Sequence, residues 1–357
     1  MTLATSSGSG IVSSAITNKQ PNSWRASRII GILIFLSLTS IAIACVTGSV
    51  SLSFSELFHG LLELLNGKPS TLAATLLELR LSRAMLGFVT GATLALAGVL
   101  MQALLRNPLA DPYVLGISGG ASVGALTVML LIGMSWLVDL AAFGGAIAVA
   151  ALLFLLAYRD LRGSGSSDGS APLLLLTGVI VQAGCGAVIT LMLSIAPDSR
   201  LRGMVFWMIG DLSNADARVF PWVIWIVVLL FALRMARAIN VAAMHADNAM
   251  TLGINIGKLR QALFFCAALL TASAVSSAGS IGFVGLIIPH ACRFAWGADH
   301  RLLIPAASLA GGSFLVLADT LARTVVAPQQ LPVGVITAMI GVPLFLLQLH
   351  QLRKQVR

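Results

Sequence analysis

The chain has 357 residues, of which 58% are hydrophobic and only 10% are charged. Soluble domains carry about 25% charged residues, so this composition excludes a water-soluble globular protein and indicates a polytopic membrane protein. The formal charge of +9 does not indicate nucleic-acid binding, because the basic residues form short clusters between apolar stretches rather than one patch.

Residues 1–28 are rich in Ser, Thr, Asn and Gly and predict a flexible cytoplasmic tail. The remainder, residues 29–357, is predicted to form one transmembrane domain, in which ten stretches are suited to cross about 30 Å of hydrocarbon. These predicted spans are 29–47, 84–105, 113–134, 140–158, 172–195, 219–237, 259–277, 281–296, 302–321 and 332–350. With the amino terminus inside, 15 Lys and Arg residues fall in cytoplasmic segments and 7 outside, which predicts that both termini are cytoplasmic.

The most informative stretch runs from Arg80 to Gly124. It begins with Arg80 and Arg83, followed by an apolar run rich in Gly and Ala, which predicts a tightly packed membrane helix. Pro108 and Pro112 then remove backbone donors, so the helix is predicted to break there. Broken backbone near a membrane is tolerated only where protein or water covers it, which places this stretch beside a transport route.

The sequence offers no energy source of its own. It lacks the G-x-x-x-x-G-K-[ST] motif, and no loop is long enough for a nucleotide-binding domain. A proton- or sodium-driven carrier would place ionisable groups within the membrane, but the spans hold almost none besides Asp319 and His290. A separate energy-supplying partner is therefore predicted, and no catalytic residue, metal ligand or bound cofactor is expected in this chain.

Several stretches resemble one family in the same order. These are RNPLADPYVLGISGGASVGAL, GSIGFVGLIIPHACRF, DHRLLIPAASLAGG, LADTLAR and LPVGVITAMIGVPLF, and together they cover roughly residues 75–350. They resemble the permease subunits of type II ABC importers for iron chelates, haem and vitamin B12, the FecCD/BtuC-like family. The resemblance implies an all-α, BtuC-like permease fold with about ten transmembrane helices in the inner (cytoplasmic) membrane.

The resemblance also implies partners and cargo. The permease would form a homodimer with a second copy of itself and bind two ABC ATPase subunits, which use ATP and Mg. A periplasmic substrate-binding protein would deliver an iron(III)-siderophore or haem, with vitamin B12 (cobalamin) as the alternative. A stand-alone secondary transporter is the alternative from another class.

Three arginines are assigned a role by the resemblance. Arg80, Arg83 and Arg323 are implied to receive carboxylates of the binding protein, for which a planar guanidinium is well suited. The alternative for Arg80 and Arg83 is contact with lipid headgroups.

On the cytoplasmic side, the resemblance implies that loop 238–258 couples the permease to the ATPase. The coupling residues would be Asp247, Ala249, Leu252 and Gly253. Asn107 and Leu109 are implied to form a cytoplasmic gate, whereas Asn107 taken alone predicts only a helix cap or a turn. The resemblance implies that the path itself is lined by span 172–195, by a short helix near Arg202 to Gly210, and by spans 113–134 and 332–350.

Overall fold

The computed structural model describes residues 23–48, 50, 53–67, 70–158, 161, 170–213, 218–244 and 252–356, and every regular element among them is helical. The elements are α1 (Ser23–Val46), α2 (Phe54–Leu65), α3 (Leu72–Leu105), η1 (Pro112–Leu115), α4 (Ile117–Leu131), α5 (Ser135–Leu156), α7 (Ser170–Ile195), α8 (Asp198–Ile209), α9 (Val219–Met244), α11 (Ile256–Ala278), α12 (Val284–Trp296), α13 (His300–Thr324) and α14 (Val333–Val356). The all-α architecture predicted from the sequence is confirmed.

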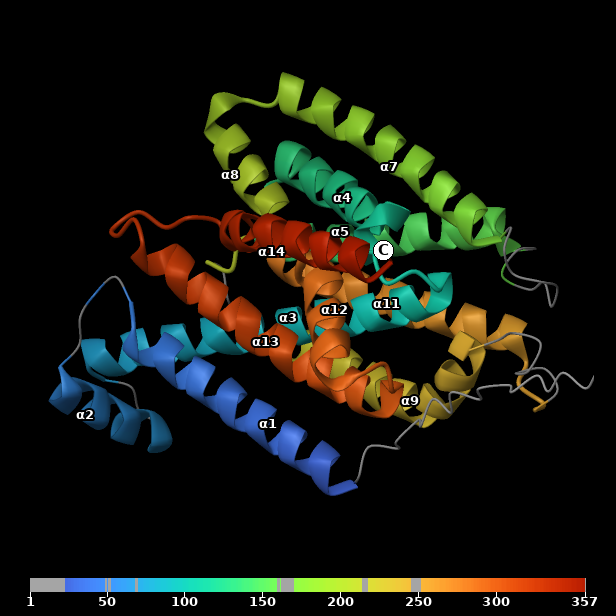
Figure 1. Ribbon diagram of the computed structural model, residues 1–357. Helices are drawn as coiled ribbons and strands as arrows, with labels where there is room; N and C mark the ends of the chain where they lie inside the picture. The colour runs from blue at the N-terminus through green and yellow to red at the C-terminus, as the bar shows by residue number, and fades with distance from the viewer. Residues whose placement is uncertain are drawn as a thin grey trace, which may run out of the picture.

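Helix α3 forms the centre of the molecule (Figure 1), and 94% of its most apolar window is buried. Helices α11, α12 and α13 pack against it. A Cβ atom added at Gly98 would lie 1.8 Å from the carbonyl oxygen of Gly285, and one added at Gly91 would lie 2.2 Å from that of Gly311. The predicted close packing is confirmed, because only residues without a side chain fit at these two contacts.

The peripheral helices expose long apolar surfaces. Helix α7 lies at one edge of the molecule, and α1 with α2 lies at the opposite edge (Figure 1). In α1, α5, α7 and α9, only 17% to 33% of the most apolar window is buried. Because such surfaces are too large and too apolar to face water, the chain is a multi-pass membrane protein whose outer helices face lipid or another protein.

The ten predicted spans correspond to ten helices, with one correction. Seven helices are long and apolar enough to cross a membrane, and α4 and Val333–Leu347 of α14 are shorter apolar segments. The tenth, predicted over 281–296, is α12, which begins at Val284 and has 13 residues. At 1.5 Å per residue it is about 20 Å long, which, like the 15-residue α4, is shorter than the thickness of the hydrocarbon core; its predicted start at 281 is corrected to Val284.

Several boundaries also differ from those predicted. Helix α1 already begins at Ser23, so the last six residues of the predicted tail are helical, whereas residues 1–22 lie outside the described residues. Helix α3 begins at Leu72, twelve residues before the predicted span, and is capped by the Thr71 side chain. The sequence prediction missed α2, whose start is marked by a capping box between Ser53 and Glu56.

The chain breaks where the two prolines predict. Arg106 ends α3 in the left-handed conformation at φ +48°, and the 3-10 turn η1 follows before α4. A second interruption, residues 279–283, separates α11 from α12. The two interruptions meet, because the backbone N–H of Ile281 donates to the Tyr113 hydroxyl at 3.1 Å. Ile281 is completely buried, so protein covers this non-helical backbone, as membrane depth requires.

Candidate functional site

A buried ion cluster joins the end of α13 to α3, on the side predicted to face outward. Arg83 binds the Asp319 carboxylate through Nε, at 3.1 and 2.9 Å, and through Nη2, at 2.8 Å. Nε of Arg323 lies 3.0 Å from the other oxygen of Asp319. Nη1 of Arg83 donates to Gln330, which precedes α14, at 2.9 Å. Since a buried charge without a partner is strongly destabilising, this cluster fastens α3, α13 and the approach to α14 together.

Arg80 fastens α1 to α3 by a different interaction. Its Nη1 donates to the carbonyl oxygens of Cys45 and Val46, both at 3.1 Å, and its Nη2 donates to that of Val50 at 2.5 Å. The last carbonyls of a helix lack partners within the helix, and a cation is favourable at that end. A Cβ atom at Gly48 would lie 2.5 Å from Arg80 Nη2, so the glycine leaves room for the guanidinium.

The structure brings the three predicted docking arginines to one end of the molecule but leaves little of them exposed. Arg80, Arg83 and Arg323 are 7%, 8% and 6% exposed. Their docking role therefore stays a prediction, and the described contacts make them internal ties between helices. The sequence reasoning did not identify Asp319 as their partner. The sequence does show that Asp319 and Arg323 are four residues apart, a spacing that brings two side chains together on a helix. Arg83, in contrast, is 236 residues away from Asp319.

At the opposite end, the two predicted gate residues form a local turn. The Asn107 side chain accepts a hydrogen bond from the backbone N–H of Leu109 at 2.9 Å, and Leu109 is 37% exposed. This is the turn that Asn107 alone predicts, and the gate role stays a prediction. Nearby, the Asp111 side chain caps η1 by accepting from the N–H of Tyr113 at 2.8 Å, and burial raises the pKa of that carboxyl to about 6.

The predicted coupling loop is described only in part. Helix α9 continues to Met244 and α11 begins at Ile256, so both ends of loop 238–258 are helical. Asp247 and Ala249 lie outside the described residues. Leu252 is 68% exposed, and Gly253 has a φ of +77°.

The helix that leads into this loop is held at two points. Nδ2 of Asn240 donates to the Asp299 carboxylate at 2.7 Å, and Nη2 of Arg106 donates to the carbonyl of Ala242 at 2.8 Å. The first contact joins α9 to the start of α13, and the second joins it to the end of α3. The helix that enters the loop is therefore tied to both α3 and α13.

The short helix expected to line the path is present as α8, over Asp198–Ile209. Helix α7, which precedes it, is the most exposed of the long apolar helices, with 17% of its window buried. Within the described part of the chain, no three His, Cys, Asp or Glu side chains are grouped so that they could hold a metal ion.

Known proteins resemble this chain over nearly its whole length. The FecCD transport family matches residues 32–351. The hemin transport system permease HmuU of Yersinia pestis is 37% identical over 318 residues, which cover 86% of this chain and 91% of the relative. The cobalamin import permease BtuC of Halobacterium salinarum is 40% identical over 78% of this chain and 74% of its own. The vitamin B12 permease BtuC of Escherichia coli O9:H4 is 37% identical over 78% and 84%.

A solved structure, described as an inward-facing conformation of a transporter of the metal-chelate ABC type, superimposes with a TM-score of 0.79 and 27% identity. The match covers 91% of this chain and 99% of the other. The family match over residues 32–351, several relatives above 30% identity and the shared fold agree. The chain belongs to the FecCD transport family.

Proposed function

We propose that this chain is the permease subunit of an ATP-binding cassette importer that moves an iron(III)-siderophore or haem across the cytoplasmic membrane. The observation that carries the proposal is the family match over residues 32–351, which includes the hemin permease relative. Both termini are proposed to be cytoplasmic. Cobalamin is the second candidate cargo, because the relatives also include vitamin B12 permeases at 37% and 40% identity.

Energy is proposed to come from two ATPase subunits that use ATP and Mg. The acidic residue inside α13, Asp319, is 2% exposed and bound to two arginines, which disfavours a role in proton transport. The test is uptake into proteoliposomes that contain the permease with or without the ATPase encoded beside it. Radiolabelled haem, ferric siderophores and cyanocobalamin would be compared, with ATP inside or outside. Accumulation against a gradient without the ATPase would establish a secondary transporter instead.

The loop between α9 and α11 is proposed to be the ATPase contact, with Asp247, Ala249, Leu252 and Gly253 as its residues. Support comes from the exposure of Leu252, which is 68%, and from the ties that anchor α9 to α3 and α13. Leu252→Asp is expected to leave ATP hydrolysis by the ATPase intact while abolishing the uptake that depends on it. Arg28→Ala, an exposed change in α1 outside loop 238–258, is the control. Normal uptake by the Leu252→Asp protein would remove this residue from the contact.

The arginine cluster is proposed to receive carboxylates of a substrate-binding protein. Arg83 and Arg323 share one carboxylate, that of Asp319, and Arg80 binds only backbone carbonyls, which leaves positive charge for an acidic partner. Arg80, Arg83 and Arg323 are at most 8% exposed. Docking would therefore require that the ends of α1, α3 and α13 move apart, or that one arginine breaks its ion pair with Asp319.

The docking role and the structural role of Arg80 can be separated. Arg80→Gln removes the contact between α3 and the C-terminal end of α1. It is compared with Arg28→Gln, an exposed change near the N-terminal end of α1. Both the affinity for the neighbouring binding protein and the thermal stability are measured. Docking predicts an affinity loss of at least about tenfold, the value of one charge-assisted hydrogen bond. A lowered melting temperature with unchanged affinity would assign Arg80 to helix packing alone.

A second copy of the chain is proposed to cover α7. Leu176, Ile180 and Leu191 are 56%, 63% and 61% exposed, and a Cβ atom at Gly184 would meet nothing within 4 Å. These residues follow one stripe of the helix. In a background without native cysteines, Gly184→Cys is expected to form a disulfide-linked dimer, whereas Leu140→Cys on α5 is not. Equal cross-linking of both variants would refute this interface.

A further inference from the structure

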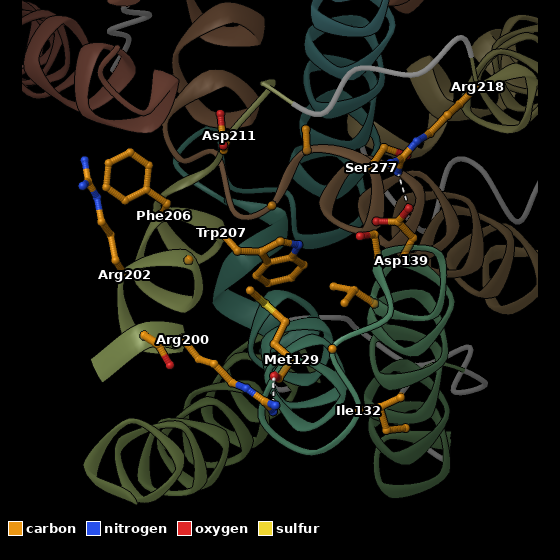
Figure 2. Close-up of a pocket in the computed structure, with 17 residues that line it drawn as sticks. Met129, Ile132, Asp139, Arg200, Arg202, Phe206, Trp207, Asp211, Arg218 and Ser277 are labelled. Carbon is orange, nitrogen blue, oxygen red and sulfur yellow. Dashed lines mark hydrogen bonds and ion pairs between the residues drawn. The ribbon is translucent and has the colours of Figure 1, made fainter. Parts of the chain in front are cut away.

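A cavity of about 820 Å³ lies under α8, on the side of the protein where α4 ends and α5 begins. The turn between α4 and α5, the start of α9 and the end of α11 complete its walls. Figure 2 shows Trp207 and Met129 in its middle, between Arg200 on one side and the Asp139–Arg218 pair on the other. One wall is α8, the short helix that the family resemblance implies to line the path, but no occupant of the cavity is proposed above.

The charged residues that line the cavity are Asp139, Arg200, Arg202, Asp211 and Arg218, and they are unequally paired. Arg218 and Asp139 form an ion pair at 2.6 Å. Nη1 of Arg200 donates to the carbonyl oxygens of Met129, at 3.2 Å, and Leu130 at the end of α4. No carboxylate within the described residues lies at ion-pair distance from Arg200, so its positive charge is oriented by backbone but not neutralised. This arrangement favours an anionic occupant.

The mouth of the cavity adjoins an apolar turn. Leu131, Ile132 and Met134 are 72%, 51% and 54% exposed, and Trp136 is 67% exposed. Ile132 also lines the cavity itself. Exposed apolar residues on a membrane protein face lipid or another protein, and an exposed Trp favours lipid here because Trp is enriched at the boundary between hydrocarbon and water. The cavity therefore opens where the headgroups and the first methylene groups of a bilayer lie.

We propose that this cavity binds the headgroup of an anionic phospholipid from the outer leaflet. The phosphate would pair with Arg200, and the glycerol and upper acyl carbons would lie against Met129, Ile132 and Trp207. Basic pockets between transmembrane helices are suited to lipid headgroups, and the volume lies within the range of small-molecule sites. An acidic protein segment would satisfy Arg200 equally well, but the apolar turn at the mouth favours an amphiphile. This inference does not depend on the substrate of the permease.

The chain supplies a matched control for Arg200 on the same helix. Arg202, which also lines the cavity, carries the same charge two residues further on, but its guanidinium lies 5.3 Å from the Phe206 ring rather than on the carbonyls at the end of α4. In Figure 2 it points away from Trp207, whereas Arg200 reaches towards Met129. Removal of either arginine changes the net charge equally, so only a specific site distinguishes the two variants.

The test uses the full-length protein in nanodiscs of phosphatidylcholine, with or without phosphatidylglycerol. Native mass spectrometry measures the lipid that the protein retains. In a second assay, phosphatidylglycerol brominated near the glycerol quenches the fluorescence of nearby tryptophans. The contribution of Trp207 is the difference in quenching between the unmodified protein and the Trp207→Phe protein. Arg200→Gln is expected to lower phosphatidylglycerol retention about fivefold, from about 1 kcal/mol per basic residue, with a matching loss of quenching. Arg200→Lys should retain binding, and Arg202→Gln should resemble the unmodified protein.

Three results would overturn the proposal. Equal retention of the two lipids by the unmodified protein would remove the preference for an anion. Equal losses in Arg200→Gln and Arg202→Gln would show that Arg200 is not the specific partner of the phosphate. If polyglutamate changed Trp207 fluorescence while phosphatidylglycerol did not, the occupant would be an acidic protein segment.

Discussion

Replacement of Asp319 by Asn should destabilise the protein more than most single changes. The side chain is 3% exposed in its ion pair with Arg83, whose side chain is 10% exposed, and it also binds Arg323 at 3.0 Å. The variant keeps the size of the residue but leaves two buried guanidinium groups without a counter-charge. Breaking a buried pair by removing one partner costs about 3–5 kcal/mol, and we expect a loss of unfolding free energy in this range.

The assay is unfolding of the purified protein in detergent, followed by tryptophan fluorescence. Asp139→Asn is the matched control, because it removes the same charge from the Arg218 pair, whose side chains are 24% and 32% exposed. Such a pair contributes about 1 kcal/mol or less. The double variant Arg83→Gln, Asp319→Asn should lose less than the sum of the single losses, because the two side chains are in contact. Equal stability of Asp319→Asn and Asp139→Asn would refute the structural role of the cluster.

Two further predictions concern helix packing and pH. Gly98→Ala should lower stability by about 1–3 kcal/mol, because the new Cβ would lie 1.8 Å from the Gly285 carbonyl oxygen. The control is Gly144→Ala, whose Cβ meets nothing within 4 Å and which should be neutral or stabilising. Equal effects of the two changes on thermal unfolding would contradict the packing argument. Burial raises the Asp111 pKa from 3.8 to about 6, so its contribution to stability is complete below pH 3.8 and is lost as pH rises through about 6. Ionisation at pH 7 then costs at most about 3 kcal/mol. An Asn side chain can still cap the turn. The Asp111→Asn protein should therefore be more stable than the unmodified protein at pH 7 and equally stable near pH 4. A difference in stability that does not change with pH would contradict the assignment.

The sequence predicted the features that depend on local composition. Long apolar stretches identified the spans, because a helix that crosses hydrocarbon must be apolar along its length whatever it packs against. Pro108 and Pro112 predicted the break after α3, because a proline lacks its donor in every context. The Gly and Ala residues of α3 predicted close packing, and the contacts of Gly91 and Gly98 confirm it.

Short or mixed segments were harder to predict. Helix α12 was predicted to begin at residue 281, but Phe283 adopts a left-handed φ of +71° and the helix starts at Val284. The interruption itself was predicted, between 277 and 281, but Ile281 and Phe283 are apolar, so hydropathy placed the start of the second helix three residues too early. Helix α2 was not predicted, because a segment of twelve residues with two glutamates does not resemble a membrane span. Its capping box can nevertheless be recognised in the sequence.

What the sequence alone determined is the class of protein, the family resemblance and the order of the membrane helices, since each follows from residues close together in the chain. Only the tertiary structure decided that the predicted docking arginines are engaged by Asp319 and by the end of α1, and that Arg200 faces a cavity without a described carboxylate beside it. The physical reason is that the environment of a charge is set by residues brought together from distant parts of the chain. Arg83 and Asp319 are 236 positions apart, and no local pattern records that they touch.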